Sequence, residues 1–271
     1  EIAAHKVVEN LLATLPTYLN HLKDNNQVLV KDIERLSKTY LMSESDVNHV
    51  RRLQADLDSL EITISDMTSE QEEYSEAYSV LEERLENIQA ALKEIEDVQF
   101  SVSERLVQIE KDDVNARQKA NVYVNRLHTI KRYMEKRNLP GIPQNFLKLF
   151  FAASHSTEDL MAELEQSQVN IESVNRILEI ASHDMEVLET ETYSIVQYAT
   201  LTEQLLQYSN RYRSFDEGIQ QAFHESLEIF ENAFDYQASF EKISQALEVA
   251  EPGVTNRFVS SYEKTREIIR F

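Results

Sequence analysis

The most regular feature of the chain is a repeat of apolar positions at alternating steps of three and four residues. Such a heptad seam is typical of helices that bury one stripe against their neighbours. The first run continues from Val50 without a slip and has one polar core position, Gln71. It therefore predicts one helix over residues 46–97. Its members are Leu53, Leu57, Leu60, Ile64, Met67, Gln71, Tyr74, Tyr78, Leu81, Leu85, Ile88, Leu92 and Ile95.

A capping box formed by Thr68 and Gln71 could instead start a new helix inside this run. A loop at that point would normally shift the phase of the seam, so we favour the single helix. At 1.5 Å per residue it would be roughly 78 Å long, whereas a compact globule of this size has a radius of gyration of about 18 Å. The expected molecule is a rod.

Two further seams follow along the chain. Three seams of this length must bury against one another or against a partner chain. The second comprises Val102, Leu106, Ile109, Asp113, Ala116, Ala120, Tyr123, Leu127, Ile130 and Met134. The third comprises Leu160, Leu164, Ser167, Ile171, Val174, Leu178, Ala181, Met185, Leu188, Thr192, Ile195, Ala199, Thr202 and Leu206.

Helix breaks are few, because only 3 of the 271 residues are Gly and 4 are Pro. Folds with many tight turns are excluded, since hairpins depend on these residues. The first helix carries Pro16. Breaks are predicted at residues 42–45, with Ser43 or Ser45 as N-cap; at 98–103, with Ser101 or Ser103 as cap; at 138–143; at 154–157, with Thr157 as cap; at 214–216; and at 251–253.

Helical segments of about 35 to 55 residues that are joined by short turns form antiparallel neighbours. We therefore predict an all-α fold of elongated spectrin-like triple-helical bundle repeats that share long helices. The expected divisions are a repeat region over residues 1–137, a Pro/Gly turn and short helix over 138–156, and a C-terminal repeat over 157–271. A parallel dimeric coiled coil is the alternative, but the breaks at 140–143 and 252–253 favour a chain that folds back.

The charge and the cysteine content narrow the choice of partners. The formal net charge is −21, which repels nucleic-acid phosphates and anionic lipid over most of the surface. The absence of Cys excludes disulfides and thiolate sites and fits a reducing cytoplasm.

No apolar stretch approaches the roughly 20 residues that span a bilayer. The chain begins at Glu1 already in a helical pattern, from which we expect an anchor or first domain to precede it.

No motif for catalysis or cofactor binding is visible. Gly141, Gly218 and Gly253 stand alone, so GxGxxG, Walker A and GxSxG sequences are absent. Two pairs have the i, i+4 spacing that can hold a metal, but neither gathers a third ligand. They are His5 with Glu9 and His224 with Glu228. We expect no enzyme activity, no cofactor and no metal.

Residues 126–137 form a basic segment within the acidic chain. Five cations gather there just before the turn at 138–143, and the apolar residues 145–151 follow. One interpretation is a helix end that complements the macrodipole, followed by an apolar turn packed over the bundle. The other is a contact with an acidic partner or with anionic lipid. The cations are Arg126, Lys131, Arg132, Lys136 and Arg137.

Residues 193–212 are poor in charge, with only Glu203 and Arg211 among twenty positions. A helix with this composition cannot keep a fully charged outer face. Tyr193, Tyr198 and Tyr208 widen the seam. Either the last two helices bury the segment on several sides, or it presents a neutral, aromatic and Arg-bearing surface to a partner.

Three segments together resemble one protein family. They are residues 201–213 (LTEQLLQYSNRYR), residues 138–143 (NLPGIP) and residues 250–258 (AEPGVTNRF). In these the chain closely resembles the C-terminal half of the septation ring formation regulator family, EzrA, over most of residues 138–271. The earlier residues agree in character only.

The resemblance implies a bacterial regulator and scaffold of cell division, held to the cytoplasmic face of the membrane at the septum by an N-terminal helix. Such proteins restrain assembly of the tubulin-like protein FtsZ and link it to other division proteins. The family's QNR patch, which matters for mid-cell localisation, maps without departure onto Gln207, Tyr208, Ser209, Asn210, Arg211, Tyr212 and Arg213. A purely structural coiled-coil spacer is the alternative function, and association of two copies stays open.

Overall fold

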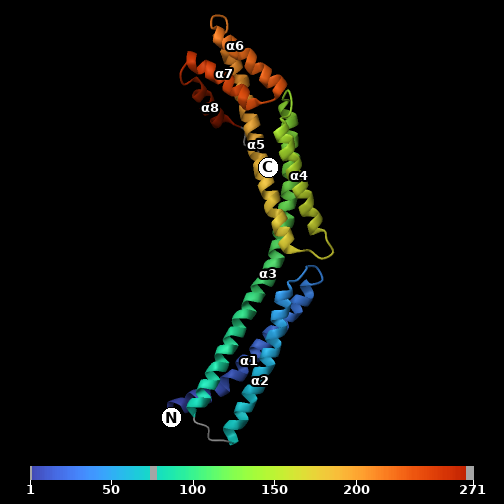
Figure 1. Ribbon diagram of the computed structural model, residues 1–271, viewed down its shortest axis with the longest axis vertical. Coiled ribbons are helices and arrows are strands. Elements are labelled where there is room, and N and C mark those ends of the chain that lie inside the picture. Colours follow the sequence, from blue (N-terminus) through green and yellow to red (C-terminus); the bar gives the residue numbers. More distant parts are fainter. Residues whose placement is uncertain (1, 74–77, 267–271) are drawn as a thin grey trace. The chain divides into compact units, whose positions relative to one another are not determined.

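The computed structural model describes residues 2–73 and 78–266, with side chains over residues 5–69 and 79–266. The described backbone is helical apart from turns and one isolated bridge between Tyr40 and Val169. The all-α class is confirmed, and the spectrin-like repeat stays a prediction. The elements are α1 (Ile2–Leu36), α2 (Glu44–Glu73), α3 (Tyr78–Arg137), α4 (Gln144–Leu164), α5 (Ile171–Ser209), α6 (Glu217–Glu228), the π-helical turn η1 (Ile229–Ala233), α7 (Tyr236–Ala250) and α8 (Val254–Thr265) (Figure 1).

The chain divides into two compact units. Unit 1 comprises residues 1–115 and 163–174, and unit 2 comprises residues 116–162 and 175–271. The boundaries fall inside α3, near the end of α4 and near the start of α5. Each unit has its own apolar core, built mainly from the heptad positions.

In unit 1, α1, α2 and the first part of α3 enclose one core. Where α1 contacts α3, residue numbers increase in the same direction along both helices, so these two helices are parallel. Where α1 contacts α2, the numbers increase in opposite directions, so these two helices are antiparallel. The three helices therefore run up, down and up. The pairs are Tyr18 with Glu96 and Leu22 with Gln99 for α1 and α3, and Lys23 with Asp58 and Asn26 with Val50 for α1 and α2.

The single helix predicted over residues 46–97 is wrong. α2 ends at Glu73 and α3 begins at Tyr78. α3 then runs back along α2, because Arg105 Nε donates to Asp46 Oδ1 at 2.9 Å, whereas one helix from 46 to 105 would hold these residues roughly 90 Å apart. The length of about 78 Å therefore has no basis. Met67 and Leu81, on either side of the reversal, are buried in the same core, so the seam is confirmed as core there. Its members Gln71, Tyr74 and Tyr78 lie outside the described side chains.

Four of the predicted breaks are confirmed and two are wrong. Breaks do occur at 42–45, 138–143, 214–216 and 251–253. In contrast, α3 continues through residues 98–103, and α4 continues through 154–157. Thr157 is 2% exposed, so it belongs to the core and caps no helix.

Two further reversals were not predicted. The first lies at residues 165–170, where Asn170 Oδ1 accepts from the Ser173 amide at 3.1 Å and begins α5. Ser167, a predicted seam position, is exposed in this turn. The second follows η1, where Phe234 has a φ of 56° and Asp235 Oδ1 accepts from the Ala238 amide at 3.0 Å.

In unit 2, the last part of α3 runs parallel to α5, and α4 returns beside them. Tyr123 OH donates to Ser182 Oγ at 2.8 Å, and Arg137 Nη2 donates to Glu203 Oε2 at 2.9 Å. The end of α5 packs with α6, α7 and α8 around a second core that includes Leu205 (Figure 1).

The turn at 138–143 is fixed by Phe234, in the turn before α7, and by Tyr236, the first residue of α7. Tyr236 OH donates to the Gly141 carbonyl oxygen at 2.6 Å. The ring of Phe234 lies so close that a Cβ on Gly141 would be 2.4 Å from its nearest atom. Glycine is required here because the backbone and an aromatic ring approach each other directly.

We expect Gly141→Ala to destabilise the protein by about 1–3 kcal/mol, because the methyl group has to displace the Phe234 ring. Urea unfolding followed by circular dichroism measures this. Gly218→Ala is the matched control. The nearest atom to its Cβ is Asp216 Oδ1 at 3.3 Å, and alanine favours a helix. Equal stability of the two variants would contradict the prediction.

Candidate functional site

The residues predicted from the QNR patch lie together where α5 ends. The last turn of α5 contributes Gln207, Tyr208 and Ser209, and the turn that leads to α6 contributes Asn210, Arg211, Tyr212 and Arg213. The structure thus places all seven on one short stretch of unit 2.

The preceding part of the charge-poor segment is core. Val196, Leu201, Thr202 and Leu205 are buried on more than one face of α5, and the Tyr198 ring lies 5.3 Å from that of Phe240 on α7. Burial by the last helices explains why residues 193–206 contain only one charged side chain, Glu203. It does not explain the residues after Leu206.

The α5–α6 turn is held by its own hydrogen bonds. Ser209 is fully buried, and its Oγ donates to the Leu206 carbonyl oxygen at 2.7 Å. The Tyr212 amide donates to the Ser209 carbonyl oxygen at 2.9 Å. Asp216 then caps α6, because its Oδ1 accepts from the Ile219 amide at 3.0 Å. The backbone of the turn therefore has a defined path.

Glu251, in the turn between α7 and α8, joins this stretch to the last helix. Tyr208 OH and Tyr212 OH each donate to Glu251 Oε2 at 2.6 Å, and Arg257 Nη2 donates to Oε1 at 2.8 Å. These hydrogen bonds lower the pKa of Glu251 to about 2, and the bond from Tyr208 has the largest effect. The bond to the Glu251 carboxylate is the main reason that the pKa of Tyr212 rises to about 12. The carboxylate acts as a shared acceptor that ties three elements together.

The cations beside this network have different roles. The Arg213 guanidinium lies 3.6 Å from the centroid of the Phe223 ring, and its Nη1 donates to Asn210 Oδ1 at 2.9 Å. The Arg211 guanidinium lies over Tyr208 at 4.6 Å, and its side chain is exposed. Arg213 therefore stabilises the fold, while Arg211 remains available at the surface.

The seven predicted residues thus divide into two groups. Tyr208, Ser209, Tyr212 and Arg213 are buried or half-buried inside unit 2. The exposed members are Gln207, Asn210 and Arg211.

Sequence reasoning did not assign Phe215 to the site. Its side chain is 73% exposed, next to this surface, and its ring centroid lies 6.0 Å from that of Tyr212. The only signal in the sequence was its position in a predicted turn. We define the end patch as Gln207, Asn210, Arg211 and Phe215. Its arginine, amides and aromatic ring, without an acid, are the composition of protein interfaces.

The two His–Glu pairs that have metal-ligand spacing gather no further ligand in the described part of the chain. His5 Nε2 lies 3.2 Å from Glu9 Oε1, and the His224 ring packs against Phe223 with 5.6 Å between centroids. Among the described residues, no group of three or more His, Cys, Asp or Glu side chains could hold a metal ion.

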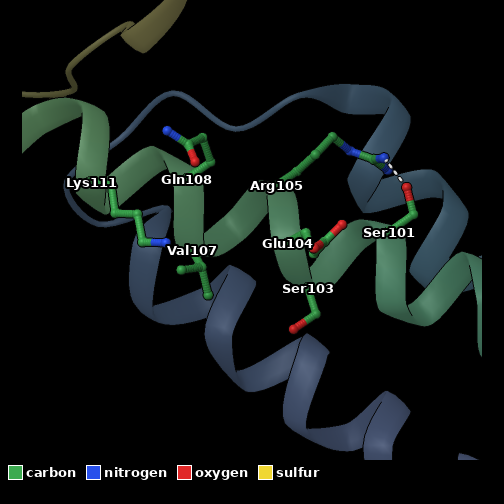
Figure 2. A pocket seen from close by; sticks show the side chains of 7 residues that line it. All are labelled: Ser101, Ser103, Glu104, Arg105, Val107, Gln108 and Lys111. Atoms are coloured by element: carbon green, nitrogen blue, oxygen red, sulfur yellow. Dashed lines mark hydrogen bonds between the residues drawn. The ribbon is translucent and has the colours of Figure 1, made fainter.

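A surface depression of about 490 Å³ in unit 1 does not have the features of a substrate site. All seven lining side chains come from α3 (Figure 2). The cation Arg105 is already bound to Ser101 Oγ at 2.6 Å and to Asp46 of α2. An exposed wall from one helix cannot enclose a ligand.

Comparison with known proteins identifies relatives over the whole chain. The sequence profile described as "Septation ring formation regulator, EzrA" matches residues 1–262. Proteins named septation ring formation regulator EzrA from Streptococcus pneumoniae strains Hungary19A-6, G54 and D39 are each 76% identical over 271 residues. The match covers 100% of this chain and 47% of each relative, so the chain spans about half their length. No solved structure matches it. Within the described residues, no helix has the length and apolarity needed to cross a membrane.

Because the folded pKa of Glu251 lies below its ordinary value of 4.5, its ionised form stabilises the fold above about pH 4.5. This contribution is lost as the pH falls towards about 2. We therefore expect Glu251→Gln to be less stable than the wild type at pH 7 and to approach it at about pH 2. Urea unfolding of both proteins at each pH measures the difference. A stability gap that does not change with pH would contradict this role of the charge.

Proposed function

This chain belongs to the septation ring formation regulator family, EzrA, and we propose from that premise that it is a non-enzymatic regulator and scaffold of bacterial cell division. In this proposal it restrains assembly of the FtsZ ring and links division proteins at the septum. It acts at the cytoplasmic face of the membrane, to which a preceding N-terminal helix anchors it. The relatives named as septation ring formation regulators are about twice as long as this chain.

The proposal rests mainly on one contrast: side chains of the end patch are exposed, while the residues around them are held in place by hydrogen bonds. Arg211 and Phe215 are exposed, while the residues between and beside them are held by Glu251 and by the buried Ser209. A surface that is ordered before binding loses less conformational entropy when a partner docks. We therefore assign docking to the end patch and support to the other QNR residues.

The restraint on FtsZ follows from charge in this proposal. The chain has a formal net charge of −21, and a bulky acidic protein fixed to acidic filaments disfavours their lateral contacts. The end patch provides the local attachment, since it contains the cation Arg211 and no acid.

The second candidate function is a structural spacer in which the end of α5 is only core. The burial of Val196, Leu201 and Leu205 favours it. A spacer function does not account for the exposure of Arg211 and Phe215 at the same end of α5.

Binding of purified FtsZ to this chain, measured by co-sedimentation and biosensor, separates the two candidates. The double variant Gln207→Ala/Arg211→Ala changes two exposed side chains of the end patch. Arg213 is unsuitable, because its loss would also remove the contact with Phe223. We expect at least tenfold weaker binding, which is about 1.4 kcal/mol, with helicity and melting nearly unchanged.

The matched control is Arg52→Ala/Gln89→Ala, which removes an exposed arginine and an exposed glutamine from unit 1. It should bind FtsZ as the wild type does. Equal binding by both double variants would move the docking site away from the end patch. Wild-type binding that does not change between low and physiological salt would contradict the electrostatic part of the proposal.

Phe215→Ser tests the residue that the sequence did not assign. Because the side chain is 73% exposed, we expect a change of less than about 0.5 kcal/mol in the free energy of unfolding. FtsZ binding should weaken several-fold, since an exposed aromatic ring is a typical interface anchor. Unchanged affinity in the same biosensor assay would exclude Phe215 from the docking surface.

A further inference from the structure

The basic segment at the end of α3 contains cations that the fold does not use. Arg126 Nη1 donates to Glu189 Oε1 at 2.9 Å, and Arg137 Nη2 donates to Glu203 Oε2 at 2.9 Å. Both acceptors are on α5, so these two arginines join helices within unit 2. Three of the five cations are left to explain.

Lys131, Arg132 and Lys136 are exposed, and none of them forms an ion pair with another described residue. They span about 7.5 Å along the helix axis. Arg132 and Lys136 are four residues apart and share the face away from the buried Ile130 and Met134, whereas Lys131 is turned by roughly 100° from Arg132, on the flank of the helix. Glu135 is the one acid between residues 126 and 137. We call these three cations the basic stripe.

The helix macrodipole does not account for the basic stripe. Its effect falls off within the last turn of a helix, and the last turn of α3 contains Lys136 and Arg137. Lys131 and Arg132 lie before that turn. They form a local excess of positive charge on a chain whose formal net charge is −21.

We propose that the basic stripe is a docking site for a short acidic segment of another protein, separate from the end patch. A short acidic segment complements the stripe in charge. Its small size lets it reach the three cations without facing the acidic surface elsewhere on the chain. The contact is electrostatic, because no large apolar side chain is exposed among the described residues 125–137.

A membrane surface fits the basic stripe less well. A helix that lies on a bilayer buries aromatic or aliphatic side chains beside its cations, and residues 125–137 expose none of this kind. A bilayer is also an extended plane of negative charge, so docking would bring the acidic remainder of the chain close to it. These two observations favour the acidic protein segment.

The test uses the full 271-residue chain and a fluorescent octapeptide of alternating Glu and Ser, with the Gln/Ser peptide as neutral probe. Fluorescence anisotropy is measured at about 10 mM ionic strength, where the Debye length is about 30 Å. We expect the acidic peptide to bind and the neutral one not to. Binding should weaken at about 0.15 M, where the Debye length is about 8 Å.

The variant Lys131→Gln/Arg132→Gln/Lys136→Gln removes the basic stripe while keeping good helix formers. We expect it to bind the acidic peptide at least roughly fivefold more weakly. The matched control Lys31→Gln/Lys38→Gln/Lys119→Gln removes the same charge from exposed positions elsewhere and should bind as the wild type does. Circular dichroism and melting establish that both variants fold.

Three results would overturn the proposal. Failure of the wild type to bind the acidic peptide, or equal weakening in both variants, would mean that the basic stripe is not a site. Binding of the wild type to phosphatidylglycerol vesicles in the absence of peptide binding would assign the stripe to a membrane. Sedimentation that shows self-association lost only in the stripe variant, again without peptide binding, would assign it to a second copy of the chain.

Discussion

A helix with one apolar seam has to cover that seam with neighbouring helices, and this requirement shapes both units. In each unit the chain meets it with helices that run up, down and up around a shared core. The seam of α3 serves both cores, since Leu92 belongs to the first and Ile130 to the second. The surfaces available for function are those that helix packing does not bury, namely the outer helix faces and the turns.

The same seam explains what could be predicted of the fold. Most seam residues are core, but periodicity did not reveal the two reversals that interrupt the seams. Met67 and Leu81 are 14 residues apart, and Leu164 and Ile171 are 7 apart. Both intervals are whole heptads, so the phase continues across a turn as it would along a helix. Turns with Pro or Gly, as at 138–143, were predictable from backbone chemistry. The turn at 165–170 contains neither residue.

For the candidate site, the sequence located the segment but could not show which of its residues support the fold and which are exposed for binding. Arg211 and Arg213 are equivalent by composition and by position in a predicted turn. They differ because Phe223 of α6 lies under Arg213, whereas Arg211 stays at the surface. Likewise, the hydroxyl groups of Tyr208 and Tyr212 bind Glu251, about 40 residues later in the chain. Such long-range contacts leave no trace in a local pattern. The 73% exposure of Phe215 leaves none either, so this residue was not assigned.

The two surfaces differ in how a partner would be held. The end patch rests on hydrogen bonds to a carboxylate whose pKa is about 2, so its support persists across the physiological pH range. It combines an aromatic ring with a cation, and both kinds of side chain commonly dominate binding energy at interfaces. The basic stripe has charge alone, on exposed side chains that pack against no core. Screening by salt therefore weakens the stripe far more than the end patch. The first surface suits a contact defined by shape, and the second suits rapid electrostatic capture of a flexible acidic chain.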